Sequence, residues 1–169
     1  DTGERTHVSF GMNYRMTELQ AAVARAQLTK LPDVVRRRRR TARRLADGLR
    51  RLPGLGVPAD LERHAVWLFP VVLDVEAAGG DNRAWAAALA AEGVPVSPGY
   101  LSQPVYGYPV LAQRRLYGGS GFPFTSPPAR TEFTYGPGLC PRAERLIGET
   151  LLVVHWNEAY TDADADEIA

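Results

Sequence analysis

The chain enters its first helix through residues 11–22, which read GMNYRMTELQAA. Within this stretch Thr17 and Gln20 have the spacing of a capping box, in which two side chains bind backbone N–H groups that the start of a helix leaves free. The Ala-rich sequence that follows favours a helix to Leu28. Because its small side chains would let another backbone approach closely, we expect this helix to be buried or to lie at an interface.

The loop ahead of this helix carries groups that suit an anionic ligand. Asn13 has a planar amide, and Arg15 has a five-donor guanidinium that matches phosphate or carboxylate. A loop that runs into a helix N-terminus is also a favourable place for an anion. These residues by themselves leave two interpretations open, an anion contact or hydrogen bonds that only stabilise the loop.

The rest of the chain alternates helices with short apolar strands, an order that predicts a small α/β domain. Pro70 falls inside one strand and marks a bulge or a sheet edge. The helix that begins at Thr161 is barely two turns long, which predicts that the chain is cut inside an element. The expected helices are 32–52, 81–91, 141–150 and one from 161, and the expected strands are 65–75, 94–96 and 151–154.

Between residues 97 and 141 the chain is dominated by Gly, Pro, Tyr, Phe and Ser, and no helical period survives. A segment this long without regular elements is usually functional in a compact domain. Its tyrosines, Tyr100, Tyr106 and Tyr108, either line a pocket or cover the core. The sequence does not separate these two roles.

Composition excludes several kinds of protein. The chain has 169 residues, a formal net charge of +1, one cysteine and no apolar run of membrane-spanning length. We therefore expect a cytoplasmic protein with no membrane partner and no intramolecular disulfide. Nineteen of the 20 basic residues are arginine, so chemistry that needs a lysine amine must use Lys30 or a lysine from elsewhere.

The run Arg36–Arg40 resembles a nucleic-acid patch, but a net charge near zero and the absence of interleaved aromatic residues argue against one. We interpret it as the solvated face of a helix and expect no nucleic-acid partner. His7, His64 and His155 lack the spacing of metal ligands, so no metal site is expected. His155 ends an apolar strand, where it is either a binding side chain or a structural histidine.

Read as a pattern, residues 11–22 resemble the signature of the DegT/StrS family of sugar aminotransferases. The similarity continues over nearly the whole chain. It includes residues 28–31, the arginine-rich helix, and residues 52–55, 90–100, 104–106 and 140–145. One departure is the sequence Val154–Asn157, where the family often has a Leu-Pro pair after its last core strand.

The resemblance implies the C-terminal region of a fold type I pyridoxal-phosphate enzyme with an α/β fold, working as a homodimer with active sites at the subunit interface. Residues 1–30 would be the end of the large domain, with the cofactor-phosphate loop and an interface helix. Residues 31–169 would be the small domain, cut short at its end. By position in the family motif, Asn13 and Arg15 would bind pyridoxal 5'-phosphate, with Asn13 reaching the cofactor of the other subunit.

The resemblance also implies substrate contacts from Tyr14, Tyr100, His155 and Tyr160. The reaction would move an amino group from glutamate or glutamine to a keto-sugar nucleotide or a cyclitol ketone, in the biosynthesis of secondary metabolites or cell-surface sugars. The Schiff-base lysine of the family lies upstream of the Asn13 motif, and Lys30 lies beyond that motif. We therefore expect the catalytic lysine upstream of this chain, and no activity from the chain alone.

Two alternatives remain. In a sugar dehydratase of the same family a histidine replaces the cofactor lysine, so the upstream residue would decide between the two reactions. The other alternative is a non-catalytic interaction module that keeps only the small domain.

Overall fold

The computed structural model describes residues 11, 14–114, 120–130 and 132–169. The chain divides into two compact units. Residues 15–100 and 149–169 form the sheet unit, and residues 1–14 and 101–148 form the loop unit.

The sheet unit is built on four short strands in the order β1-β2-β4-β3, and every neighbouring pair is antiparallel. Because β2 and β3 are both antiparallel to β4, they run parallel to each other with β4 between them. Helix α4 (Asn82–Ala91) connects β2 to β3 and begins at the predicted cap, Asp81. The strands are β1 (Leu55–Gly56), β2 (Leu68–Leu73), β3 (Val96–Pro98) and β4 (Leu151–His155).

The place of Pro70 in β2 follows from the length of β1. Pro70 is paired with Val153 of β4, whereas β1 reaches only Val72 and Leu73 on the other side of β2. Along the described strands, Pro70 therefore has no neighbour on its β1 side. Its missing N–H costs no hydrogen bond there, and the predicted edge position is confirmed.

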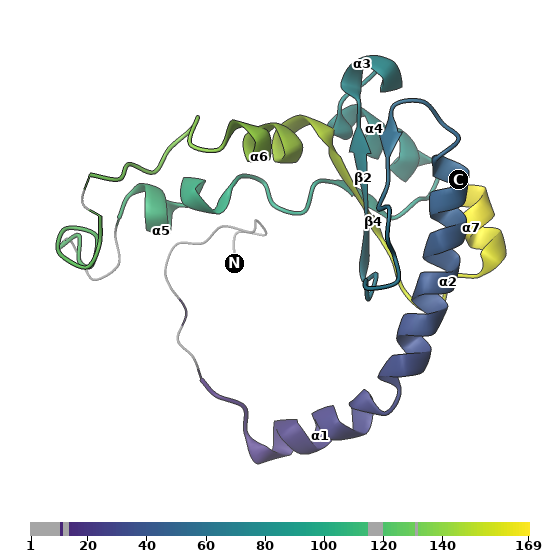
Figure 1. Ribbon diagram of the computed structural model, residues 1–169, viewed down its shortest axis with the longest axis horizontal. Helices are drawn as coiled ribbons and strands as arrows, with labels where there is room; N and C mark the ends of the chain where they lie inside the picture. The colour runs from purple at the N-terminus through teal and green to yellow at the C-terminus, as the bar shows by residue number, and fades with distance from the viewer. Residues whose placement is uncertain (1–10, 12–13, 115–119, 131) are drawn as a thin grey trace. The chain divides into compact units, whose positions relative to one another are not determined.

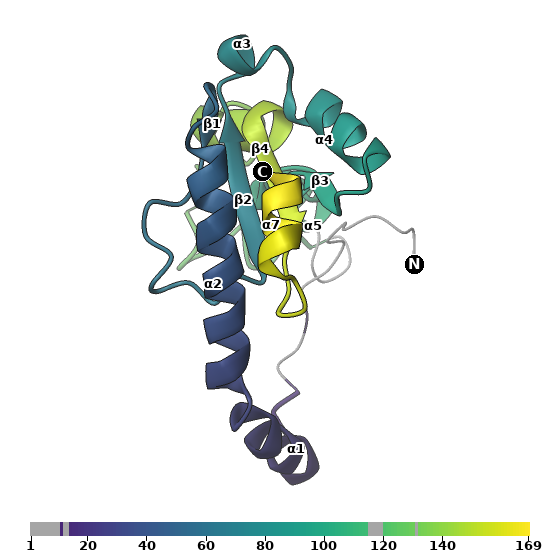
Figure 2. The ribbon, with the colours of Figure 1, turned by 90° about the vertical axis from the view of Figure 1, so that its right-hand side faces the viewer.

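Helices α2 (Leu31–Leu49) and α7 (Asp162–Ile168) lie side by side on one face of the sheet (Figures 1 and 2). The apolar stripe of α2 supplies the fully buried Leu45, and α7 supplies the fully buried Ala165. A capping box between Thr161 and Asp164 begins α7. Packing against α2 thus stabilises a helix that would be marginal alone. The sheet contributes Phe69, Val71, Leu73, Leu152 and Val154 to the same core.

The interpretation of Arg36–Arg40 as a solvated face is only partly correct. Arg36 and Arg40 are exposed, but the three arginines between them are half-buried. Arg38 donates from Nε and Nη2 to the Glu158 carboxylate, at 2.8 and 2.6 Å. Arg40 pairs with Asp162, and Arg44 pairs with Asp166. These arginines bind the segment that leads into α7, so much of their charge is used inside the domain.

Helix α1 (Glu18–Leu28) begins with the predicted capping box of Thr17 and Gln20. Of the two expected positions, buried or at an interface, the first does not hold in this chain, because none of its residues is buried and Leu19, Val23 and Leu28 are each more than half exposed. It lies beyond the N-terminal end of α2, away from the sheet (Figures 1 and 2). Its role as an interface helix stays a prediction.

The loop unit contains little regular structure, in line with its composition. A 3₁₀ turn at Val105–Gly107 is followed by the short α5 (Pro109–Ala112). The single helix expected over 141–150 is instead α6 (Pro141–Arg145) followed by a π-helical turn, Leu146–Thr150, which leads into β4. The glycine at 148 and the following strand favour this loosened end over a continuous helix.

The buried stripe of α2 can be tested by truncation. Leu45→Ala should lower the free energy of unfolding by about 2–5 kcal/mol, because it leaves a cavity in a fully packed core. Leu52→Ala, at an exposed leucine after the helix, should change it by less than about 1 kcal/mol. Urea denaturation measures both. Equal losses in the two variants would contradict the assignment of the core.

The ion pairs of α2 predict an acid dependence. The hydrogen bond from Arg38 holds the pKa of Glu158 below its usual value. A lowered folded-state pKa means that the stabilisation is present above the unfolded pKa and is lost as the pH falls through the folded pKa. Glu158→Gln should therefore flatten the loss of stability on acidification, whereas Glu92→Gln, at an exposed position, should leave its slope unchanged. Denaturation midpoints measured from neutral to acid pH check this.

Candidate functional site

His155 and Ser97 meet on one face of the sheet. His155 ends β4 with its side chain exposed, and its Nε2 lies 3.3 Å from Ser97 Oγ on β3. Ser97 Oγ donates its only proton to the carbonyl of Gly99 at 2.9 Å, so it accepts from Nε2. Nε2 then carries a proton. Nδ1 makes no hydrogen bond to the described residues.

An aromatic pair joins the segment ahead of β2 to the segment after β3. The rings of Trp67 and Tyr100 are 5.6 Å apart between centroids, with their planes at 80°. Trp67 is 58% exposed and Tyr100 is 42% exposed. Trp67 precedes Leu68, which pairs with His155 in the β2–β4 register. We call Trp67, Ser97, Tyr100 and His155 the sheet-end cluster.

Tyr160 contacts the backbone of His155. Its hydroxyl donates to the backbone carbonyl of His155 at 3.3 Å, and its ring stacks on Trp156 with centroids 4.2 Å apart and planes at 5°. Trp156 is buried, and its Nε1–H donates to Thr41 Oγ1 at 3.1 Å. Burial raises the pKa of Tyr160 above its usual value. The geometry gives Tyr160 a positioning role behind His155.

The structure places the predicted Tyr160 against His155, and the predicted Tyr100 against Trp67. It adds Trp67 and Ser97, which sequence reasoning missed. Trp67 lies inside the strand expected over residues 65–75, and an apolar run does not indicate which of its residues is exposed.

The predicted cofactor residues belong to another part of the chain. Asn13 lies outside the described residues. Tyr14 and Arg15 are both exposed, and Arg15 adopts the left-handed conformation with φ 59°, just ahead of the α1 cap. α1 itself lies away from the sheet, beyond the N-terminal end of α2 (Figure 1).

In the loop unit, a second network surrounds Glu144. Its carboxylate accepts from the Tyr106 hydroxyl and from the Gly138 N–H, the latter at 2.8 and 3.0 Å. The Cys140 N–H donates to the Tyr106 oxygen at 3.2 Å. The bond from Tyr106 lowers the pKa of Glu144, while burial and the same bond raise the pKa of Tyr106. This network links the start and the end of the loop unit.

These contacts separate the two roles left open for the tyrosines. Tyr108 is fully buried and belongs to packing. Tyr106 holds the Glu144 network. Tyr100 alone of the three presents a substantial part of its ring to solvent.

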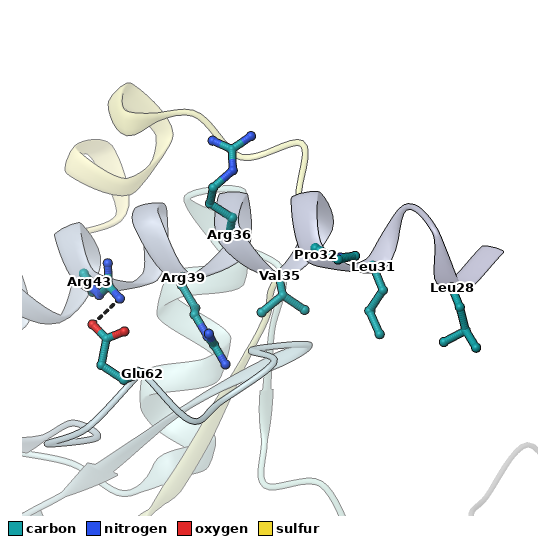
Figure 3. Close-up of a pocket in the computed structure, with 8 residues that line it drawn as sticks. All are labelled: Leu28, Leu31, Pro32, Val35, Arg36, Arg39, Arg43 and Glu62. Carbon is teal, nitrogen blue, oxygen red and sulfur yellow. Dashed lines mark hydrogen bonds and ion pairs between the residues drawn. The ribbon is translucent and has the colours of Figure 1, made fainter. Parts of the chain in front are cut away.

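A groove of about 560 Å³ lies beside the junction of α1 and α2 (Figure 3). The arginines that line it are held by protein partners. Arg43 pairs with Glu62, Arg36 pairs with Asp33, and Arg39 Nε donates to the His64 carbonyl at 2.6 Å. The groove therefore does not have the character of an open anion site. Its lining residues are Leu28, Leu31, Pro32, Val35, Arg36, Arg39, Arg43 and Glu62.

Residues 14–114, 120–130 and 132–169 contain neither a metal-ligand cluster nor a membrane-spanning helix. No three His, Cys, Asp or Glu side chains in these ranges gather as metal ligands would. No helix in the same ranges has both the length and the apolar character needed to cross a bilayer.

Solved structures of pyridoxal-phosphate-dependent sugar enzymes share this fold. DesI, solved in the presence of its TDP-sugar product, matches 94% of this chain and 35% of its own at 25% identity, with a TM-score of 0.61. S. venezuelae DesV matches 99% of this chain and 38% of its own at 24% identity, with a TM-score of 0.65. A GDP-4-keto-6-deoxymannose-3-dehydratase matches 94% of this chain and 36% of its own at 16% identity, with a TM-score of 0.59. The predicted fold class, an α/β region of a fold type I enzyme, is confirmed.

The family follows from the sequence. The model of the DegT/DnrJ/EryC1/StrS aminotransferase family matches residues 1–133, and the chain belongs to this family. A dTDP-4-dehydro-2,6-dideoxy-D-glucose 3-dehydratase from Saccharopolyspora spinosa is 39% identical over 74 residues, which are 44% of this chain and 16% of that enzyme. The chain spans little more than a third of the solved relatives above. These relatives include both aminotransferases and dehydratases.

The Glu144 network gives a local test in the loop unit. Glu144→Ala should speed the amide hydrogen exchange of Gly138 by about tenfold or more, because its N–H loses a charged acceptor. The exchange of Cys140 should also rise, since Tyr106 is no longer held beneath it. NMR-detected exchange measures both amides. Glu132→Ala, at an exposed position, serves as the control, and equal rates in both variants would refute the network.

Proposed function

We propose that this chain is part of a pyridoxal-phosphate-dependent enzyme that transfers an amino group from glutamate or glutamine to a keto-sugar nucleotide or a cyclitol ketone. The observation that carries the proposal is the family match over residues 1–133, which includes the motif at 11–22. The cytoplasmic location and the homodimer expected from the sequence belong to the same proposal. The exposed apolar side chains of α1 are consistent with an interface helix.

The start of α1 suits the cofactor phosphate. Arg15 presents an exposed guanidinium directly ahead of a helix N-terminus, and this combination favours an anion. Arg15, together with Asn13 outside the described residues, would hold the phosphate. When bound, the cofactor supplies an electron sink for the carbon that loses or gains a proton.

Lys30 lies in the wrong place to serve that cofactor in the same chain. It follows α1, whose 11 residues separate it from Arg15. At 1.5 Å per residue the helix is about 16 Å long, a span greater than the cofactor itself. Lys30 instead lines a surface pocket with Asp33, Arg37 and Glu158. We infer that the cofactor lysine comes from outside these 169 residues.

The sheet-end cluster suits the substrate side of the reaction. His155 and Tyr100 offer hydrogen-bonding and aromatic groups, which match a hydroxyl-rich molecule. Tyr160 holds the backbone at His155 from behind. Tyr14, exposed beside Arg15, stays a proposed substrate contact.

The proposal is tested in the enzyme that contains this chain, assayed with pyridoxal phosphate, glutamate and a keto-sugar nucleotide. Arg15→Ala should weaken cofactor binding by about tenfold, in line with the loss of one charge-assisted hydrogen bond. Lys30→Ala should leave both cofactor binding and the release of 2-oxoglutarate unchanged. Loss of turnover in Lys30→Ala with the fold intact would overturn the assignment of the lysine.

A dehydratase is the second candidate, and the 39% identity to the Saccharopolyspora spinosa enzyme favours it. Product analysis separates the two reactions, because transamination places nitrogen from labelled glutamate on the sugar and dehydration removes water without doing so. Formation of neither product by the enzyme with bound cofactor would favour the non-catalytic module.

A further inference from the structure

A pocket of about 360 Å³ lies within the loop unit. Its wall is mostly aromatic, with Phe124, Phe133 and Tyr135, and it also includes the arginines Arg114 and Arg130. Among the described residues, no acidic side chain lines it. Pockets of this size commonly hold small organic ligands, and they too combine apolar and aromatic walls with a few polar groups. We call it the loop-unit pocket.

Tyr135 lies at the centre of the aromatic wall. Its ring meets Phe133 with centroids 5.1 Å apart and planes at 67°, and it meets Phe124 with centroids 6.2 Å apart and planes at 78°. Because these are edge contacts, neither neighbour covers the whole ring surface of its partner. Phe133 is 38% exposed. The wall therefore has ring surface available for the flat ring of a ligand.

The two arginines of the loop-unit pocket have no acidic partner. Several arginines of α2 form ion pairs, but within residues 14–114, 120–130 and 132–169 neither Arg114 nor Arg130 does so. The guanidinium carbon of Arg114 lies 5.9 Å from the centroid of the Tyr135 ring. A guanidinium that contacts a ring in this way still has N–H donors for a carboxylate. The positive charge of the pocket is thus available to an anion.

Backbone turns position these side chains. The Phe124 N–H donates to the Gly121 carbonyl at 2.9 Å, and the Phe133 N–H donates to the Arg130 carbonyl at 3.3 Å. Arg114 adopts φ 50°, in the left-handed region that few residues with a side chain occupy. The turns order the walls without a ligand, so part of the ordering cost of binding is already met.

We propose that the loop-unit pocket binds a small aromatic carboxylate. The ring would lie against Phe133 and Tyr135, and the carboxylate would accept from the guanidinium groups of Arg114 and Arg130. The planar fork of a guanidinium matches a carboxylate, and the aromatic wall favours a flat ring over a saturated one. This inference goes beyond the proposed function and does not depend on it.

The test is a calorimetric titration of this chain with benzoate, with saturation-transfer NMR to detect the bound ring. Benzoate should bind saturably at millimolar concentrations. Cyclohexanecarboxylate keeps the charge but has no π-face, and benzyl alcohol keeps the ring but has no charge. Each should bind at least severalfold more weakly than benzoate, because each loses one of the two interactions. Inorganic phosphate should not bind saturably in the same range.

Substitutions locate the site. Arg130→Gln should weaken benzoate binding by about tenfold, the usual size of a lost charge-assisted hydrogen bond. Arg142→Gln is the matched control, because Arg142 is an exposed arginine of the same unit that does not line the pocket. Phe133→Leu should weaken binding severalfold, whereas Phe122→Leu, at an exposed phenylalanine outside the pocket lining, should not. Circular dichroism of each variant checks that the fold is retained.

Three results would overturn the inference. They are no saturable binding of benzoate to the unchanged chain, equal affinity of a folded Arg130→Gln and Arg142→Gln, and binding of cyclohexanecarboxylate or phosphate as tight as that of benzoate. The ligand comparison uses the unchanged chain, so it decides even if a variant fails to fold. Benzoate binding is measured without cofactor or keto-sugar. The loop-unit pocket and the proposed reaction can therefore fail independently.

Discussion

The sheet unit depends on the insertion of β4 between β2 and β3. Five pairs, from Leu68↔His155 to Val72↔Leu151, join β4 to β2, and three more join it to β3. β2 and β3 do not pair with each other, so the four-stranded sheet is continuous only through β4. The chain must bring residues 151–155 back across more than fifty intervening residues, so this pairing bears a loop-closure cost that burial of the strand has to offset.

Exposure along β4 changes at its last residue, because Leu152, Val153 and Val154 are buried and His155 is exposed. Leu152 and Val154 point into the core beneath α2 and α7, whereas His155 ends the strand exposed. The register of β4 therefore decides on which face of the sheet His155 lies, because a shift of one residue would exchange the two faces. Ser97 is aligned with it by the pairing of β3 on the same strand.

The arginines of α2 form ion pairs within the same unit. α2 carries apolar residues on the face toward the sheet and arginines beside them, and several of these reach acidic residues at the end of β4 or in α7. Individually such exposed pairs contribute little. Together they orient the chain between β4 and α7. The arginines of α2 therefore make contacts within the unit, in a chain that is nearly neutral as a whole.

Local patterns were sufficient for the helix starts and most strands, because caps and apolar runs act over a few residues. The capping box at Thr17, the cap at Asp81, the helix start at Thr161 and the strand at residues 151–154 were all readable in this way. The family, too, was visible in the motif at residues 11–22. The sequence alone also established that Lys30 follows that motif.

Only the tertiary structure decided the exposure of α1, the half-burial of the arginines and the pairing of Trp67 with Tyr100. Each depends on which distant segment packs against it, and no local pattern of residues records that choice.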